Sequence, residues 1–355
     1  MTLGPRPAAG RRDTGSDVLG PDYRVETFSL PPDDEGAVVA TLVTRQPERP
    51  HGGAVLHVHG FADYFFHDEY ARWWTERGWT FYAIDLRKYG RSLREHQTPH
   101  FVSDLSEYHA EIDLAWWRIT QRDGHRSVVV TGHSTGGLTV PLWAHERRPA
   151  ELVGMVLNSP WFDMQGSAWL RSPAATVALE RLGARRPLQE IPRKVSEVYG
   201  RSLHQAHGGE WDYDLDWKPL ESRPVYVGWL RAVRRGHARL HAGLDVPAPV
   251  LVLSSARSVF AAPSDEDVRT SDIVLDVEQI RRWASSIGRH VTSVAVEGAV
   301  HDVVLSRPDV RREVYAVIDR WLDAWIDVGV PASGQQEHQD GDADHGDHAT
   351  QQRRG

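Results

Sequence analysis

The sequence predicts an α/β fold in which helices flank a mostly parallel central sheet. Short apolar, β-branched runs alternate with longer segments of helical period, which is the pattern that such layered folds produce. Most of these runs are continuously apolar, as expected of strands buried on both faces. One interval, about 160–246, breaks the alternation because it contains no convincing strand. Since an ordinary loop of that length is improbable, we expect an inserted helical cap over one edge of the sheet.

Eight strands and several helices follow from this pattern in chain order. The strands are expected at 23–30, 37–43, 54–58, 80–84, 127–131, 152–157, 249–254 and 292–296. Apolar residues at helical spacing predict helices at 68–77, 103–121, directly after Ser134, and at 277–287 and 309–326. Pro141 falls within the helix expected after Ser134, so we expect a kink or a shortened first segment there.

The 355 residues are enough for roughly two domains, but both ends of the chain differ from the folded pattern. Residues 1–20 are rich in Gly, Pro and Arg and lack the apolar stretch of a secretory signal. Residues 332–355 consist largely of Gln, His, Asp and Gly. We therefore expect disordered ends on either side of one domain at 21–331, with the cap inserted at about 160–246.

Composition excludes several kinds of chemistry. The chain has no cysteine, which removes thiolate nucleophiles, disulfides and thiolate metal sites. Its net charge of -8 and scattered arginines offer no basic face for a nucleic acid. No apolar run approaches the ~20 residues of a membrane span. We expect a cytoplasmic protein with no transmembrane segment, no nucleic-acid partner, and no metal or organic cofactor.

The strongest chemical motif lies directly after the apolar run at 128–130. Residues 132–137 read GHSTGG, which is G-x-S-x-G between an expected strand and an expected helix. A nucleophilic serine must project from a strained strand-to-helix turn, and the flanking glycines allow the backbone to turn that tightly. A phosphate-binding loop is the alternative, but the motif lacks the lysine of a Walker sequence. Ser134 is therefore the predicted nucleophile.

Together with three further motifs, this turn resembles the α/β-hydrolase family. The motifs are HGF at 59–61, DLRKYGRS at 85–92 and GAVHD at 298–302. The resemblance spans about 23–326 and is closest to the monoglyceride lipase and lysophospholipase-like branch, also described as the serine aminopeptidase group. It implies a serine hydrolase that cleaves a small-molecule acyl ester through an acyl-enzyme on Ser134.

A serine hydroxyl needs a general base, and the base needs an orienting acid. In this fold the chain order is Ser, acid, His, and His301 follows the last expected strand. We expect His301 to be the base, and we interpret His57 and His133 as packing histidines.

The position of the acid is less direct. After the strand at 249–254 the family usually carries an aspartate, but residues 254–258 read SSARS, and a polar insertion at 259–271 follows. Residues 271–276, SDIVLD, then resemble the family's D-x-V-V, so Asp272 is the expected acid. Asp163 is a competitor because some relatives draw the acid from the preceding strand, and Asp276 could instead cap a helix. The acids at 265–267 are interpreted as a solvated loop.

Backbone N–H groups of Phe61 and Thr135 are the expected donors to the oxyanion. Five of the fourteen tryptophans lie in the insertion, and Trp161, Trp169 and Trp229 are candidates to line a substrate pocket, although such rings can also form the cap's own core. The acidic run at 210–216 could hold a substrate ammonium group, or it could be a solvated loop. Three functions stay open: an esterase or lipase, which we favour, a peptidase or amidase, and a non-catalytic ligand-binding relative.

Overall fold

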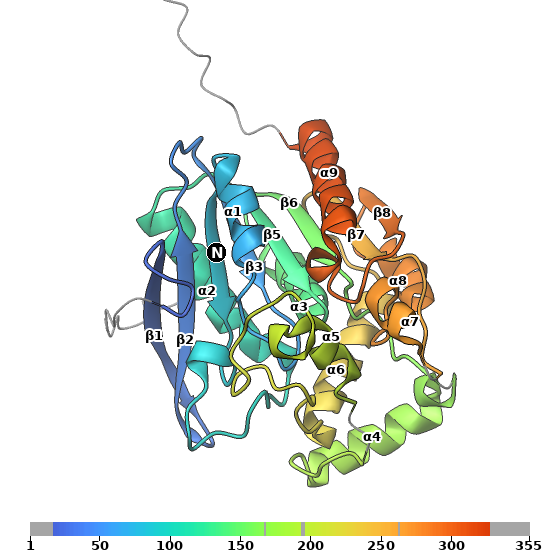
Figure 1. Cartoon of the computed structure of the whole chain (residues 1–355). Helices are drawn as coiled ribbons and strands as arrows, with labels where there is room; N and C mark the ends of the chain where they lie inside the picture. The colour runs from blue at the N-terminus through green and yellow to red at the C-terminus, as the bar shows by residue number, and fades with distance from the viewer. Residues whose placement is uncertain (1–16, 167, 193–195, 262, 327–355) are drawn as a thin grey trace, which may run out of the picture.

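The protein is built around one eight-stranded sheet, shown in Figure 1. The computed structural model describes residues 17–326 except 167, 193–195 and 262. The strand order is β1-β2-β4-β3-β5-β6-β7-β8. The strands are β1 (Tyr23–Asp33), β2 (Gly36–Arg45), β3 (Gly53–Val58), β4 (Thr80–Asp85), β5 (Ser127–His133), β6 (Leu152–Asn158), β7 (Val250–Ser255) and β8 (Val291–Val296). Only β1 with β2 and β2 with β4 pair antiparallel, so the predicted mostly parallel sheet is confirmed.

Helices cover both faces of this sheet. They are α1 (Asp68–Glu76), α2 (His109–Trp117), α3 (Thr135–Arg147), α4 (Pro173–Arg185), α5 (Val198–Leu203), α6 (Val227–His241), α7 (Asp265–Thr270), α8 (Val277–Ala284) and α9 (Pro308–Trp325). The central strands are apolar throughout because alternate side chains enter two different cores. Val128 and Val130 pack in the core that includes α2, α3 and α8, whereas Val129 packs in the core that includes α1 and α9. No helix among the described residues is long and apolar enough to cross a membrane.

Three sequence expectations differ from the structure. Helix α3 runs without a break through Pro141, so the expected shortening is wrong; its flanking residues Val140 and Leu142 are buried, and such packing stabilises a helix despite a missing hydrogen bond. The acids at 265–267 begin helix α7 rather than forming a loop, because Ser264 and Asp267 make a reciprocal capping box.

The third difference concerns the chain before β1. Residues 17–20 were expected in a disordered segment, but Asp17 accepts two hydrogen bonds of 2.7 Å from the Arg91 guanidinium. This bidentate pair is largely buried and fixes the start of the described chain against the loop after β4. The rest of the two expected disordered ends, 1–16 and 327–355, lies outside the described residues.

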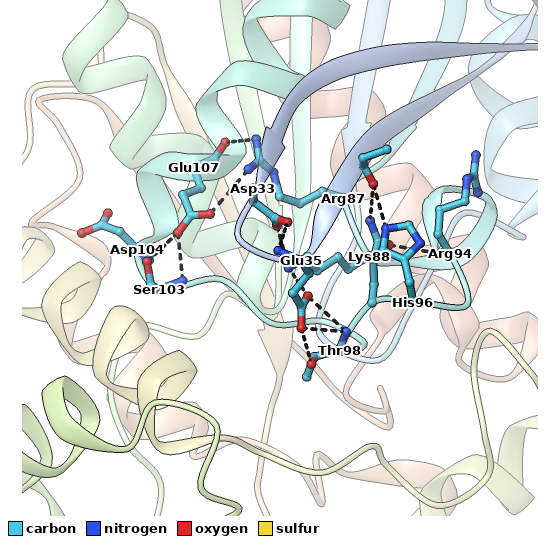
Figure 2. A network of polar contacts seen from close by, with 12 residues as sticks. Asp33, Glu35, Arg87, Lys88, Arg94, His96, Thr98, Ser103, Asp104 and Glu107 are labelled. Atoms are coloured by element: carbon cyan, nitrogen blue, oxygen red, sulfur yellow. Dashed lines mark hydrogen bonds and ion pairs between the residues drawn. The ribbon is translucent and has the colours of Figure 1, made fainter.

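A polar network fastens the β1–β2 hairpin to the loop after β4 (Figure 2). Lys88 is buried, and its ammonium lies 2.7 Å from Asp33 Oδ2 and 2.5 Å from Glu35 Oε2. Glu35 also accepts hydrogen bonds from the backbone and hydroxyl of Thr98. On the other side, Arg87 Nε donates to the fully buried Glu111 at 2.6 Å. Lys88 of the DLRKYGRS motif therefore fastens the edge hairpin, and Arg87 ties the same loop to helix α2.

The segment between β6 and β7 (residues 159–249) is referred to here as the insertion. Its described part contains α4, α5 and α6, together with isolated bridges and no strand, as the sequence predicts. Figure 1 shows these three helices gathered at one end of the sheet. The insertion leaves β6 at its carboxyl end, which is also the end from which β5 delivers Ser134. It is therefore attached at the edge where parallel sheets carry their sites.

Candidate active site

Ser134 lies at a strained turn between β5 and α3. Its φ is +53° and its ψ is -113°, a conformation that costs a non-glycine residue of order 1–3 kcal/mol. The turn is pressed against the end of β3: a Cβ added at Gly136 would lie 2.4 Å from the carbonyl oxygens of Val58 and His59. Only glycine fits at that position. The expected sharp turn is thus present, and it projects the Ser134 side chain beyond the sheet.

His301 bridges Ser134 and Asp272. The Nε2 atom of His301 lies 3.2 Å from Ser134 Oγ, and its Nδ1 atom lies 2.9 Å from Asp272 Oδ2. All three side chains are buried. With a proton on Nδ1, the imidazole donates to the carboxylate and turns the Nε2 lone pair toward the serine hydroxyl. This arrangement can withdraw a proton from Ser134 and stabilise the resulting imidazolium.

Asp272 reaches this position although the chain departs from the family pattern after β7. The segment 259–271, which contains α7, leaves the sheet and returns so that Ser258 and Asp272 form a parallel bridge. Asp272 N donates to Arg257 O, and Asp272 O accepts from Val259 N, each at 3.0 Å. The extra segment 259–271 therefore moves the acid further along the sequence, but Asp272 still lies beside the end of β7.

The turn that follows fixes the Asp272 carboxylate. Its Oδ1 accepts hydrogen bonds from the backbone of Val274 and Leu275 at 2.8 and 2.7 Å, which leaves Oδ2 for His301. Ser258 Oγ donates to Leu275 O at 2.7 Å and closes the same turn. A carboxylate held by backbone donors in this way is oriented before any substrate arrives.

The two competing acids have other partners. Asp163 is buried, and its Oδ1 lies 2.9 Å from Arg234 Nη1 of the insertion. Asp276 caps α8 by accepting a hydrogen bond from Glu278 N at 3.1 Å. The geometry favours Asp272 over both.

The loop after β3 passes close to the serine. A Cβ added at Gly60 would lie 3.0 Å from Ser134 Cβ, which is tighter than an ordinary van der Waals contact, so a side chain there would force Ser134 to shift. Phe61 follows, and its ring packs 4.2 Å from that of Trp229. Thr135 N lies at the amino end of α3, where the helix dipole is positive. Phe61 and Thr135, the expected oxyanion donors, line the same cavity as Ser134.

A cavity of about 220 Å³ opens above these residues. Phe61, Ser134 and His301 lie in its wall together with residues of the insertion, and Trp161 and Trp229 line it as expected. Trp169 does not: it is 63% exposed in a short helical turn, so this pocket prediction is wrong. Nearby, Arg171 donates to the carbonyl oxygens of Met164 and Gly166.

The acidic run at 210–216 does not supply the cavity wall with carboxylates. Glu210 Oε2 lies 2.6 Å from Arg311 Nη1, and Asp214 Oδ1 accepts from the backbone of Asp216. Tyr213 is the member of the run that lines the cavity. Apart from histidines, the charged side chain among the described lining residues is Lys218. The described residues that line the cavity therefore include no carboxylate, which an amine-binding site would need.

Sequence reasoning missed a buried polar network beneath the site. Asp302, directly after His301, accepts from Asn158 Nδ2 at 2.6 Å, and its other oxygen lies 3.0 Å from His67 Nε2. Burial alone would raise the pKa of Asp302, but the neighbouring His133 and His67 outweigh it and hold that pKa far below its ordinary value. The position of Asp302 directly after His301 in the sequence could have indicated that this carboxylate lies near the site.

A second part of the network joins the insertion to the loop after β3. Asp63 Oδ1 lies 2.7 Å from Lys218 Nζ, and Asp63 Oδ2 lies 3.3 Å from His133 Nδ1. Burial would raise the pKa of Asp63, but Lys218 and His133 outweigh it and keep that pKa well below its usual value. Nothing in the sequence connects Asp63 with Lys218.

Asp63, His133 and Asp302 bring three potential metal ligands within 4.8 Å of one another. The ammonium of Lys218 already compensates Asp63, and Asn158 and His67 already occupy Asp302. This donor set fits an internal ion-pair network better than a metal site, which would need oxygen or nitrogen atoms free to coordinate.

The sheet order and the turn at Ser134 define an α/β-hydrolase fold. Residues 49–307 match the model of the family described as serine aminopeptidase, S33, and the chain belongs to that family.

Similar proteins include several lipases. The chain is 23% identical over 291 residues to the phospholipase YtpA of Bacillus subtilis, covering 80% of this chain and 99% of the relative. A monoacylglycerol lipase structure from Paleococcus ferrophilus matches with a TM-score of 0.58 at 20% identity, covering 80% of this chain and 98% of that one. A soluble variant of the monoglyceride lipase of Saccharomyces cerevisiae, in complex with a substrate analog, matches with a TM-score of 0.60 at 14% identity, covering 83% of this chain and 94% of that one. These structures share the fold of this chain.

Proposed function

We propose that the protein is a serine hydrolase that cleaves carboxylic esters. The observation that carries the proposal is the placement of His301 between its two partners, 3.2 Å from Ser134 Oγ and 2.9 Å from Asp272 Oδ2. In this proposal Ser134 is the nucleophile, His301 the general base and Asp272 the acid that orients it. Backbone N–H groups of Phe61 and Thr135 stabilise the oxyanion, each with an effect on the order of 10²–10³ on the rate.

The proposed reaction has two halves. Ser134 Oγ attacks the ester carbonyl carbon while His301 Nε2 takes the hydroxyl proton and then gives it to the departing alcohol, leaving an acyl group on Ser134. Water then attacks the acyl carbon as Nε2 takes its proton, and the carboxylic acid leaves when that proton returns to Ser134. His301 Nε2 accepts and then donates the proton in each half of the reaction, and Asp272 orients the ring without taking up that proton.

The apolar wall of the cavity favours a substrate whose apolar acyl group is bound there. Trp161, Trp229 and Leu220 belong to its wall, and burying such surface contributes about 25 cal/mol per Å². The relatives named as monoglyceride lipases and as a phospholipase agree with an ester of the monoacylglycerol or lysophospholipid kind.

The two other functions considered from the sequence have less support. A peptidase that selects an amino terminus would need a carboxylate in the cavity, but Glu210 is paired with Arg311, and no Asp or Glu is among the described lining residues. A non-catalytic binder would follow from a missing acid, yet Asp272 accompanies His301 at hydrogen-bonding distance. Both observations favour the esterase.

Hydrolysis assays test this proposal. We expect p-nitrophenyl esters of short and medium chain acids to be cleaved by the wild type, and aminoacyl p-nitroanilides to be cleaved at least about a hundredfold more slowly. Ser134→Ala should abolish the ester activity while retaining the unfolding temperature. Faster cleavage of the anilides would favour the peptidase, and no turnover of either class would favour the non-catalytic binder.

A further inference from the structure

The ion pair between Lys218 and Asp63 connects the insertion to the loop that carries Phe61. Its Nζ to Oδ1 distance is 2.7 Å, the Asp63 side chain is 1% exposed and that of Lys218 is 12% exposed. Asp63 is two residues after Phe61 in the sequence, and Lys218 lies between α5 and α6. We propose that Lys218, acting through Asp63, is a positioning residue that holds the Phe61 N–H where the oxyanion forms. This inference rests on the proposed function.

The backbone between the two residues needs such an anchor. Ala62 has a φ of +50°, in the left-handed region that a residue with a side chain rarely adopts. A strained residue persists only when its surroundings fix it from both sides. On one side, Gly60 lies so close to Ser134 that a Cβ added at Gly60 would stand 3.0 Å from Ser134 Cβ. On the other side, Asp63 is fixed by Lys218 and lies 3.3 Å from His133, the residue before the serine.

Other contacts also dock this part of the insertion on the loop after β3, so the role of the ion pair can be tested apart from docking. Asp214 N donates to Tyr64 OH at 2.7 Å, and the Tyr213 and Phe66 rings pack 4.9 Å apart. Tyr64, Phe66 and Tyr213 belong to one small apolar cluster. Removing the Lys218 charge leaves these ring and hydrogen-bond contacts in place. It removes the partner that orients the Asp63 carboxylate, together with the approach of the ammonium to the Phe66 and Tyr213 rings at 5.5 and 5.8 Å.

A purely structural role predicts different behaviour from a positioning role. If Lys218 only neutralises a buried charge, then loss of Lys218 destabilises the protein, and simultaneous loss of the Asp63 charge restores both stability and activity. If the pair positions Phe61, removing both charges restores stability but not the rate, because the anchor of the loop is still missing. The double variant Lys218→Met with Asp63→Asn distinguishes the two.

The experiment compares steady-state hydrolysis of one p-nitrophenyl ester and thermal unfolding for the wild type and a set of variants. We expect Lys218→Met to lower kcat at least about tenfold while KM changes less than about threefold, because an oxyanion donor acts mainly in the transition state. Lys218→Arg, which keeps the cation, should recover most of kcat. The double variant should regain the unfolding temperature of the wild type but keep the low kcat.

The matched control is Arg231→Met. Arg231 pairs with Glu180 at 2.8 Å inside the insertion, so its loss removes a cation of the same segment without touching the Phe61 loop, and kcat should be unchanged. An unchanged kcat in Lys218→Met would overturn the inference, as would a double variant with the kcat of the wild type. A rise in KM at constant kcat would also overturn it. An inactive wild type would refute the proposed function itself, whereas an active wild type with these variant results would refute the inference alone.

Discussion

Asp272 pairs with Ser258 in a parallel bridge, although helix α7 lies between the two residues along the chain. The bridge returns the chain to the end of β7 and places the Asp272 carboxylate 2.9 Å from His301 Nδ1. The extra segment 259–271 therefore leaves the geometry of the site intact, because the backbone pairing of Ser258 with Asp272 brings an aspartate back to the end of β7.

Replacing Asp272 tests its proposed role. We expect Asp272→Asn to lower kcat by about 10³–10⁴, because the amide favours the wrong tautomer of His301 and cannot stabilise the imidazolium. Asp163→Asn is the matched control, since it removes a buried carboxylate whose partner is Arg234, and kcat should stay within about threefold of the wild type. Ester hydrolysis under saturating substrate measures both. The reverse ranking would assign the acid to Asp163.

Ser258 should contribute to the same site through the turn that carries Asp272. Its hydroxyl donates to Leu275 O at 2.7 Å and accepts from Val277 N at 2.9 Å. We expect Ser258→Ala to lower the free energy of unfolding by about 1–2 kcal/mol and to lower kcat by less than Asp272→Asn does. Denaturant unfolding and ester hydrolysis measure the two effects. Unchanged stability would show that water replaces the hydroxyl.

Gly136 should be essential for steric reasons. A Cβ there would meet two backbone carbonyl oxygens of the β3 end at 2.4 Å, so we expect Gly136→Ala to abolish ester hydrolysis and to destabilise the fold by about 2 kcal/mol or more. Gly52→Ala is the control: its φ is +92° but the space around it is open, so it should lose only about 1 kcal/mol and keep its activity. Equal effects of the two substitutions would contradict the close packing of the Ser134 turn.

The Glu35 network predicts a dependence of stability on pH. Burial would raise the pKa of Glu35, but Lys88 and Thr98 outweigh it and hold that pKa below the ordinary value of 4.5. A group whose pKa is lowered by folding stabilises the protein above its unfolded pKa and loses this effect as the pH falls through its folded pKa. The stability difference between wild type and Glu35→Gln should therefore be full at pH 7 and shrink below about pH 4.5.

Denaturant unfolding at a series of pH values measures this difference. Asp34→Asn is the matched control, because Asp34 is an exposed acid in the same hairpin turn and should show little effect at any pH. A Glu35→Gln difference that stays constant down to pH 3 would contradict the proposed charge pairing.

Much of the fold could be predicted because its signals are local. Continuous apolar runs such as 128–130 identify buried strands, and the glycines around Ser134 identify the sharp turn. His301 could be identified as the candidate base in the same way, because it follows the last expected strand. These features depend on the residues nearest in the sequence, which is why they could be recognised without a structure.

The remaining parts depend on contacts between distant residues. Lys218 and Asp63 are brought together by the packing of the insertion on the loop after β3, and neither lies in a pattern that predicts the other. Trp169 is exposed although Trp161 and Trp229 are buried in the same segment, so an aromatic residue in the insertion was not by itself a sign of a pocket. The shortening expected at Pro141 is absent because its buried neighbours in α3 stabilise the helix despite the hydrogen bond that proline lacks.

The site of reaction with a fluorophosphonate probe tests the central claim most directly. The probe phosphonylates an activated serine with loss of fluoride, and peptide mass spectrometry locates the adduct. We predict one adduct, on Ser134, in the wild type, none in Ser134→Ala, and a strongly slowed reaction in His301→Ala. A wild type that does not react, or an adduct on a different residue, would contradict the assignment of Ser134 as the nucleophile.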